Sequence, residues 1–379
     1  MEFDFTWLLW ALPIAFVLGW VASRLDLRQL RIHNRQAQAP KAYFRGLNFL
    51  LNEQQDQAID AFIEAVRNDP DTSELHFALG NLFRRRGEYE RAVRVHEHLL
   101  SRGDLGRADR HRAQHALALD YLKAGLLDRA EEALRKLEGT AHESQSLLAL
   151  LGIYERTRDW PRAAEIARKL TERGHGDFSP RLAHYLCEEA MQAPKEQAEA
   201  LVRQAQQTAP AAARPSLELA NLQRRAGDER AAFETLAGLA ATAPLSIGLV
   251  ARPLAECAQA CAQQDRAREL LEAAYEAGGS LDVLDALVLL EPDPEAARAR
   301  YVRHLEREPS LVAAAKWVSG EKFEHEQFHA AVQRALDHAS KPLTRYRCAA
   351  CGFEANRHFW QCPGCQAWDS YPARRVEEL

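Results

Sequence analysis

Residues 41–104 read KAYFRGLNFLLNEQQDQAIDAFIEAVRNDP and then DTSELHFALGNLFRRRGEYERAVRVHEHLLSRGD, and one pattern occurs in them twice. Three positions recur at an offset of 34 residues: Gly46 falls on Gly80, Phe49 on Phe83 and Ala58 on Ala92. Small residues at fixed positions let two antiparallel helices approach closely, and large apolar residues fill the space beside them. One helix pair cannot bury its apolar face alone, so such pairs stack into a solenoid. The stretch therefore predicts an all-α repeat fold, which favours binding over catalysis.

The repeated pattern resembles the tetratricopeptide repeat and continues towards the C-terminus. The first copy runs through Gly46, Phe49, Ala58, Phe62 and Ala65 to Pro70. The closing proline lacks the N–H that would continue the second helix. Later copies are weaker, and we expect about eight or nine helical pairs in all. We predict a tetratricopeptide-repeat solenoid over residues 39–311, followed by capping helices and a linker over residues 312–343.

Composition agrees with a helical protein and argues against some classes of function. The 379 residues include only 19 glycines and 16 prolines, and strong helix formers dominate the chain. The formal net charge of -5 gives no general support for nucleic-acid binding, which favours a strongly basic surface. Four of the seven cysteines lie in the last 32 residues, which is unlike a disulfide framework. This distribution suits thiols that hold a metal in a reducing compartment.

Residues 5–23 form an uncharged stretch long enough to cross a bilayer as one helix. Indole rings favour the membrane interface, and three tryptophans lie towards the ends of the stretch: Trp7, Trp10 and Trp20. A cleaved signal peptide is the alternative, but it requires a positive N-terminal region, and here Glu2 and Asp4 come first. We therefore predict a transmembrane helix over residues 1–23 with a short periplasmic N-terminus.

The residues after the predicted membrane helix are basic. They include Arg24, Arg28, Arg31, Arg35 and Lys41 against the single acidic residue Asp26. No lysine or arginine precedes the apolar stretch. By the positive-inside rule, the chain after Ser23 is cytoplasmic. We interpret residues 24–38 as a basic juxtamembrane linker, whose charge is explained by topology without invoking specific lipid binding.

Four cysteines near the C-terminus form the sharpest local motif: Cys348 and Cys351, ten intervening residues, then Cys362 and Cys365. A two-residue gap lets both thiolates of a pair face one ion, and two pairs complete a tetrahedron without an open position for an activated water. The spacing predicts one structural metal ion, Zn²⁺ or iron of the rubredoxin type, in a domain over residues 344–379. Free thiols or a dithiol redox pair are the alternatives. Gln366 stands where such ribbons commonly have glycine, so we expect a less favourable second turn.

A second pattern suggests chemistry of another kind. His325-Glu326-Gln327-Phe328-His329 matches the His-Glu-x-x-His motif of zinc proteases, in which two histidines share a helical face beside a general-base glutamate. Charged neighbours surround it, and no third ligand can be identified. A chance match is the simpler interpretation in a chain with 14 histidines. The remaining cysteines, Cys187, Cys257 and Cys261, are interpreted as small apolar residues between helices.

The first helices of the second and third repeats contain the candidate partner-binding residues. These are Phe77, Asn81, Arg84 and Arg85 in the second copy, and Arg112, His115, Leu119 and Lys123 in the third. Together they predict a mixed apolar and basic groove that suits an acidic or amphipathic peptide. A solvated helix face is the alternative interpretation.

Together, one N-terminal membrane helix, cytoplasmic repeats and a terminal cysteine ribbon resemble the lipopolysaccharide assembly protein B family of Gram-negative bacteria. The ribbon is the more specific part, reading Tyr346-Arg-Cys-x-x-Cys-Gly-Phe353 and then Trp360-x-Cys-Pro-x-Cys-x-Ala-Trp368. Gly46-Leu-Asn-Phe-Leu-Leu51 and Leu79-Gly-Asn-Leu-Phe-Arg84 also resemble the opening repeats of that family. The resemblance covers essentially the full chain.

The resemblance implies a single-pass protein of the bacterial inner membrane that is an adaptor and not an enzyme. The family brings the deacetylase of the lipid A pathway to a membrane ATP-dependent zinc protease, and its ribbon thiolates are required and dock on the repeats. Those thiolates correspond here to Cys348, Cys351, Cys362 and Cys365. Other lipopolysaccharide assembly proteins and a membrane signalling protein are further expected partners. A scaffold for lipopolysaccharide synthesis and export enzymes is a second hypothesis, and a tethered metalloprotease using His325, Glu326 and His329 is a third.

Overall fold

The computed structural model describes residues 6–321 and 326–379, and the side chains of residues 6–12, 25–40 and 326 lie outside that description. Nearly all described elements are α-helices, which confirms the predicted all-α class. The exceptions are a two-stranded sheet and two short 3-10 helices. The chain divides into two compact units, residues 1–156 and residues 157–379.

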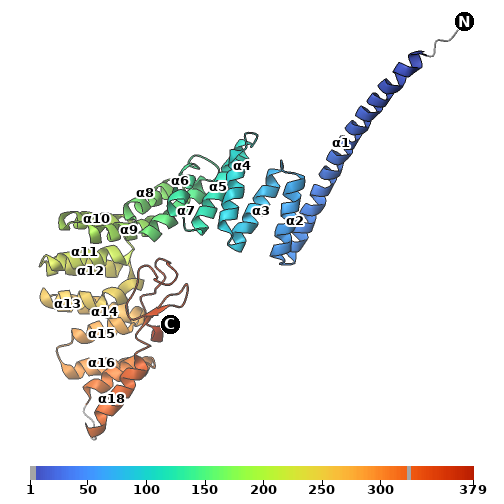
Figure 1. Ribbon diagram of the computed structural model, residues 1–379. Helices are drawn as coiled ribbons and strands as arrows, with labels where there is room; N and C mark the ends of the chain where they lie inside the picture. The colour runs from blue at the N-terminus through green and yellow to red at the C-terminus, as the bar shows by residue number, and fades with distance from the viewer. Residues whose placement is uncertain (1–5, 322–325) are drawn as a thin grey trace. The chain divides into compact units, whose positions relative to one another are not determined.

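The first unit consists of helices that pair with their neighbours along the chain (Figure 1). Its elements are α1 (Thr6–Leu51), α2 (Gln55–Asn68), α3 (Ser73–Arg86), α4 (Tyr89–Ser101), α5 (Arg107–Lys123), α6 (Leu127–Arg135) and most of α7 (Glu143–Thr157). The end of α1 packs on α2, α3 packs on α4, and α5 packs on α6. These consecutive pairs are the arrangement that the 34-residue pattern predicts.

Two glycines allow the close helix contacts in the first unit. A Cβ atom on Gly46 would lie 2.8 Å from the ring of Phe62, and one on Gly80 would lie 2.5 Å from the imidazole of His96. Ala58 and Ala92, at the other small position of the repeat, are fully buried. The prediction that these small residues permit helix packing is therefore confirmed.

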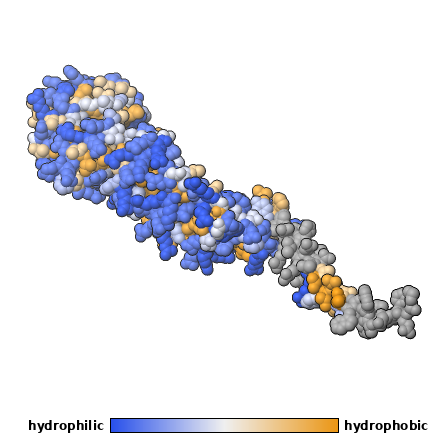
Figure 2. Space-filling model, turned by 90° about the horizontal axis from the view of Figure 1, so that it is seen from above, coloured by the Kyte–Doolittle hydropathy of each residue, from blue (hydrophilic) through white to orange (hydrophobic). Residues whose placement is uncertain are grey.

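Helix α1 continues without a break from Thr6 through the predicted linker into the first repeat. Its segment Pro13–Arg24 is apolar and exposes large side chains: Ile14, Phe16, Val17, Leu18, Trp20 and Val21. Hydrophobic residues gather on this part of the surface in Figure 2, and the Arg24 guanidinium lies 4.4 Å from the centre of the Trp20 ring. Within the described residues, no single helix has both the length and the hydropathy of a membrane span, although the bent pair Glu229–Thr242 and Pro244–Ala260 meets the test jointly.

The second unit contains the remaining helices and the cysteine ribbon. Its helices are α8 (Trp160–Glu172), α9 (Ser179–Gln192), α10 (Lys195–Thr208), α11 (Ala213–Arg225), α12 (Glu229–Thr242), η1 (Pro244–Ser246), α13 (Ile247–Ala260), α14 (Gln264–Gly278), α15 (Leu281–Leu289), α16 (Pro294–Arg307), α17 (Leu311–Gly320) and α18 (Glu326–Ser340). The predicted capping segment thus contains two helices, α17 and α18, which pack on each other. The ribbon contains strands β1 (Tyr346–Arg347) and β2 (Glu354–Ala355), which pair antiparallel, and the 3-10 helix η2 (Val376–Glu378).

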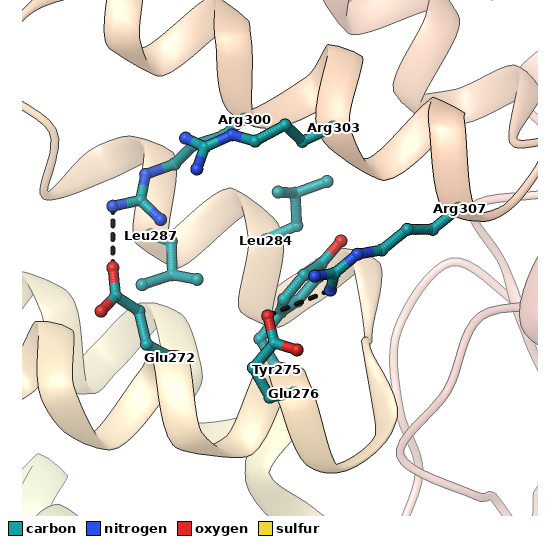
Figure 3. A pocket seen from close by; sticks show the side chains of 8 residues that line it. All are labelled: Glu272, Tyr275, Glu276, Leu284, Leu287, Arg300, Arg303 and Arg307. Atoms are coloured by element: carbon teal, nitrogen blue, oxygen red, sulfur yellow. Dashed lines mark hydrogen bonds and ion pairs between the residues drawn. The ribbon is translucent and has the colours of Figure 1, made fainter.

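Ion pairs connect second helices of neighbouring repeats in this unit. Arg300 of α16 pairs with Glu272 of α14, and Arg307 pairs with Glu276, each at 3.0 Å. These pairs bound a cavity of about 290 Å³ whose base is formed by the buried leucines Leu284 and Leu287 (Figure 3). The two ion pairs thus neutralise most of the charge around this cavity. They also help to hold α14 against α16.

Candidate metal centre

The four predicted cysteine ligands converge in the ribbon. Their Sγ atoms all lie within 4.8 Å of one another, with 3.8 Å between Cys348 and Cys365 and 3.7 Å between Cys351 and Cys362. With Zn–S bonds of about 2.3 Å, the sulfurs of a tetrahedral site lie about 3.8 Å apart. Four thiolates at these distances therefore form a metal-binding site that suits one tetrahedral ion.

Two similar turns place the ligands. After Cys348 the chain turns at Gly352, whose N–H donates to the Cys348 carbonyl at 2.8 Å with φ of 77°. After Cys362 it turns at Gln366, whose N–H donates to the Cys362 carbonyl at 2.8 Å with φ of 61°. A side chain in this left-handed region is unfavourable, so the second turn is strained as the sequence predicts.

Hydrogen bonds to sulfur favour thiolates at the two buried positions. Burial opposes ionisation of Cys348, but the Ser370 hydroxyl at 3.3 Å and the backbone N–H groups of Cys351 and Ala350 lower its pKa to about 6. Burial likewise opposes ionisation of Cys362, whose pKa is nevertheless lowered by the backbone N–H groups of Cys365 and Gly364. A thiolate is the form that binds metal.

The exposed ligand Cys351 behaves differently. A hydrogen bond from the Phe353 N–H favours its thiolate, but partial desolvation and the sulfur atoms of Cys365, Cys362 and Cys348 raise its pKa to about 12. Four negative sulfur atoms in so small a space repel one another. A divalent cation removes this conflict, so four thiolates can be present together when they bind a metal but not when they are free.

The ribbon has little apolar core of its own. Its buried cluster consists of Tyr346, Cys348, Cys362 and Tyr371, with Phe359 and Leu249 of α13 packed against it. Two of the four buried residues are metal ligands. Metal binding and contact with the repeats must therefore stabilise this segment together.

Aromatic side chains connect the ribbon to helix α9. The indole of Trp368 stacks on His184, with ring centres 4.8 Å apart, and meets the ring of Tyr185 edge-on at 5.8 Å. His184 Nε2 donates to both carboxylate oxygens of Asp369, at 2.8 and 2.9 Å. Docking of the ribbon on the repeats, which the family resemblance implies, is thus confirmed within the second unit.

The tail after the ribbon caps two further helices. The Glu377 carboxylate accepts from the N–H groups of Leu311 and Val312 and from the Ser310 hydroxyl, at the start of α17. The Glu378 carboxylate accepts from the Leu281 N–H at 2.7 Å, at the start of α15. Negative groups are favourable at helix N-termini, where the first N–H groups have no partner within the helix.

Arg375 also connects the tail to the first turn of α15. Its guanidinium forms two hydrogen bonds with the Asp282 carboxylate, at 2.7 and 2.8 Å, and donates to the Thr344 carbonyl at 2.8 Å. The same group lies 4.1 Å from the centre of the Tyr346 ring. The ribbon and its tail therefore contact the repeats from α9 to α17.

The residues predicted to bind a partner lie on α3 and α5 of the first unit: Phe77, Asn81, Arg84 and Arg85 on α3, and Arg112, His115 and Lys123 on α5. Phe77 is only 1% exposed, and the Arg112 guanidinium lies 4.1 Å from the centre of its ring. Phe77 thus contributes to packing between repeats, not to an open surface. Arg85 and Lys123 are exposed.

Other side chains of this face are held by internal contacts. Arg84 donates to the buried carboxylate of Asp120 at 2.8 Å and to the Asn81 amide oxygen at 2.6 Å. The ring of His115 stacks on His142 with centres 5.0 Å apart, and burial, followed by the nearby charges of His142 and Arg84, lowers the pKa of His115. The face therefore combines fixed and exposed basic groups.

The described residues provide little support for a zinc-protease site at the His-Glu-x-x-His motif. His325 lies outside the described residues. His329 Nε2 donates to the Val318 carbonyl at 2.9 Å and so is used within the fold. In the described part of the chain, the ribbon cysteines are the only group of three or more ligand-type side chains arranged to hold a metal.

The remaining cysteines behave as core residues, as predicted. Cys187 and Cys257 are fully buried, and Cys261 is partly buried. Burial raises the pKa of Cys187 and of Cys257 to about 12, so both thiols are protonated at neutral pH.

Four residues of this site were not predicted from the sequence: His184, Asp369, Glu377 and Glu378. Each forms its contact with a residue distant in the chain; His184 and Asp369, for example, are 185 positions apart. A single histidine or glutamate on a helical repeat has no local pattern that distinguishes a contact residue from a solvated one.

Comparison with known proteins identifies the family. The family model described as rubredoxin metal binding domain matches residues 346–371. Lipopolysaccharide assembly protein B of Escherichia coli (strain K12) is 31% identical over 97% of this chain and 98% of its own length, and that of Haemophilus influenzae is 29% identical over 95% and 96%. A crystal structure of a tetratricopeptide repeat protein from Parabacteroides merdae has 16% identity and a TM-score of 0.35, covering 66% of this chain and 98% of its own. Identity and coverage at the level of the Escherichia coli protein show that the chain belongs to the lipopolysaccharide assembly protein B family.

Proposed function

We propose that this protein is a membrane-anchored adaptor, not an enzyme, that regulates lipopolysaccharide synthesis. It brings the deacetylase of the lipid A pathway to a membrane ATP-dependent protease and so limits the amount of deacetylase. The names of its relatives support a role in lipopolysaccharide assembly. The observation that carries the adaptor proposal is the ribbon, which together with its tail contacts α9, α13, α15 and α17. Its four thiolates form a closed set that offers no open position for catalysis.

We assign one structural Zn²⁺ to Cys348, Cys351, Cys362 and Cys365. A structural site needs a closed tetrahedron and no redox change, and Zn²⁺ meets both requirements. The same four thiolates would accept iron, as in rubredoxin. Elemental analysis of protein purified without added metal decides between the two ions.

The proposed anchor is residues 1–23, in the bacterial inner membrane with the bulk of the chain in the cytoplasm. Its support is the uncharged sequence of residues 5–23 together with the exposed apolar side chains of Pro13–Arg24. Large apolar side chains exposed along one helix are unfavourable in water and favourable in a bilayer. Confinement to the membrane raises the effective concentration of the adaptor beside a membrane protease.

The proposed partner surface in the first unit is the basic face of α3 and α5. Arg85 and Lys123 supply exposed positive charge near the C-terminal ends of α3 and α5, and Arg112 and His115 lie in the first half of α5. An acidic or amphipathic segment of the deacetylase is the expected ligand. Phe77 lies beneath this face and supports it from below.

The half-life of the deacetylase after translation is stopped tests this function. Cells depleted of this protein should degrade the deacetylase more slowly, and wild-type protein should restore degradation. The Cys362→Ser variant should restore it poorly, because it lacks one metal ligand. An unchanged half-life on depletion would reject the adaptor and favour a scaffold for lipopolysaccharide synthesis and export enzymes.

A further inference from the structure

A second site lies at the seam between the ribbon and the repeats. A cleft of about 770 Å³, here called the seam cleft, is lined on one side by loops of the repeats and on the other by the ribbon. The repeat side comprises Asp177, Ser179 and Pro180 at the start of α9, residues 208–213 from the end of α10 to the start of α11, and Leu245, Ser246 and Leu249 at the start of α13. The ribbon side includes His358, Trp360, Asp369 and residues 371–374.

The arrangement of the lining makes the seam cleft long. Its repeat side consists of equivalent loops from three successive repeats, before α9, α11 and α13. Packed helices lie about 8–10 Å apart, so three successive first helices extend over roughly 20 Å. An extended chain covers this distance with about six residues. These dimensions suit a peptide segment better than a compact small molecule.

The seam cleft is apolar beside α13. Leu245 is 90% exposed at its rim, and Leu249 packs against the ribbon core. Trp360 and the largely buried Tyr371 form the facing wall. Exposed leucine beside aromatic side chains is typical of a surface that buries apolar groups of a partner.

The two ends of the seam cleft differ in charge. Asp177 and Asp369 lie at the α9 end; a hydrogen bond from the Ser179 N–H lowers the pKa of Asp177, which keeps it ionised, and Asp369 contacts His184 of α9. Arg374 lies at the other end, where its guanidinium is 3.4 Å from the Cβ position of Gly278 at the end of α14. The cleft therefore has an acidic end and a basic end with apolar surface between them.

We propose that the seam cleft binds an extended segment of a partner protein. The segment places a basic residue beside Asp177 and Asp369, apolar side chains on Leu245 and Trp360, and an acidic residue beside Arg374. This site is distinct from the basic face of α3 and α5. Because the ribbon supplies one wall, the segment binds only when the four cysteines hold their metal, and metal loading becomes a condition for partner binding.

Fluorescence anisotropy with designed peptides tests this site on the full chain in detergent micelles. The probes are fluorescein-labelled, amidated hexapeptides, Lys-Leu-Pro-Leu-Ala-Glu and the reversed sequence Glu-Ala-Leu-Pro-Leu-Lys, with Gln-Leu-Pro-Leu-Ala-Gln as the uncharged control. One of the two charged peptides should bind saturably, and the uncharged control should bind about fivefold more weakly. Removal of metal with a chelator should abolish binding of the charged peptide.

Leu245→Ala is the diagnostic variant, because its side chain is exposed and its loss leaves the fold intact. It should weaken peptide binding about fivefold, through the lost apolar contact. Leu51→Ala is the matched control, since Leu51 is also highly exposed, at 83%, but lies in the first unit. The control should bind the peptide as the wild-type protein does.

Several outcomes would overturn the inference. They are the absence of saturable binding below about 1 mM for both charged peptides, equal binding by metal-free protein, and unchanged binding by Leu245→Ala. Displacement of the peptide by decanoate would instead identify an acyl chain as the occupant. Self-association that excludes the peptide would identify a second copy of the chain. None of these results depends on the half-life of the deacetylase, so failure here leaves the adaptor proposal separately testable.

Discussion

The imidazole of His184 contacts both carboxylate oxygens of Asp369, at 2.8 and 2.9 Å, and thereby connects repeat helix α9 to the metal ribbon. The His184 side chain is 1% exposed and the Asp369 side chain 50% exposed, so water reaches only the ribbon half of the pair. The contact lies directly beside Trp368, which stacks on the same imidazole. The metal domain is therefore held to the repeats by a polar and an aromatic contact at one residue.

Asp369→Asn should loosen this attachment without loss of metal. Asparagine keeps one acceptor oxygen and tolerates the left-handed backbone at this position, where φ is 50°, but it removes the negative charge. We expect a loss of about 1–2 kcal/mol in the stability of the docked ribbon. Fluorine NMR of 5-fluorotryptophan at Trp368 measures the docked fraction. A metal content of one ion per chain is the control, and an unchanged Trp368 signal would argue that the negative charge of Asp369 contributes nothing to docking.

The second unit should become less stable as pH falls below about 6.5, the ordinary pKa of histidine, because the pKa of His358 is lowered in the folded chain. Burial is the main cause of the lowered pKa of His358, which is opposed by its hydrogen bond to the Tyr371 carbonyl and by Asp369, and reinforced by His184 and Arg375. The unfolded chain therefore binds a proton at a pH where the folded chain does not, so stability is lost progressively as pH decreases.

Thermal unfolding between pH 8 and pH 5 measures this effect. The His358→Gln variant, whose amide can still donate to the Tyr371 carbonyl, should show a smaller pH dependence than the wild-type protein. Equal slopes for both proteins would assign the pH dependence to other groups.

Glu377→Gln should destabilise the start of α17. The amide is nearly isosteric with the carboxylate, but it loses the charge that favours the first N–H groups of the helix and can accept through only one oxygen. We expect a cost of about 1–2 kcal/mol and faster hydrogen exchange at Leu311 and Val312. Glu306→Gln is the matched control, since Glu306 is an exposed residue of α16, and it should leave these exchange rates unchanged. Equal protection in both variants would rule out a capping role.

Gln366→Gly should stabilise the metal site. The variant relieves the left-handed backbone at φ of 61°, which costs a residue with a side chain about 1–2 kcal/mol. The expected result is tighter zinc binding in competition with a chromogenic chelator. The reverse change in the other turn, Gly352→Gln, should weaken binding by a similar amount, since Gly352 has φ of 77°. Weaker binding by Gln366→Gly would mean that the glutamine side chain contributes a favourable contact.

Gly80→Ala should destabilise the first unit by about 1–3 kcal/mol. The added methyl group would meet the ring of His96, which cannot move away easily because Asp120 holds its other face through Nδ1. Chemical denaturation followed by circular dichroism measures the loss. Gly152→Ala on α7 is the control, since no atom lies within 4 Å of its Cβ position. The control should stabilise the protein slightly, by up to about 1 kcal/mol, because alanine favours helix.

The repeat fold and the metal ligands could be predicted because their signals are local. Gly46 and Gly80 recur at a fixed spacing, and the pairs Cys348–Cys351 and Cys362–Cys365 each define one turn. The unfavourable turn at Gln366 could be predicted for the same reason, because this residue directly follows the ligand Cys365 in the sequence. Helix packing and metal coordination that involve residues close together in the chain require a fixed spacing, and this spacing can be read in the sequence.

The contacts between the ribbon and the repeats could not be predicted in this way. Glu377 and Glu378 read as ordinary charged residues, yet they cap helices that begin 66 and 97 positions earlier. Phe77 is the converse case, a residue that was predicted to bind a partner but is buried. Its position in the repeat suggests the concave surface, whereas Arg112 covers its ring. Both outcomes depend on contacts between residues that are far apart in the sequence, and no local pattern records such contacts.

Repeat proteins ordinarily unfold piecemeal, because each repeat contacts only its neighbours. The tail and ribbon of this protein change that behaviour, since they join α9, α15 and α17 through contacts up to 185 residues apart. Such long-range contacts slow folding, but they make distant helices melt together. We therefore expect the second unit to unfold in one cooperative transition whose midpoint rises with free zinc concentration, so that a solenoid acquires the all-or-none character of a globular domain.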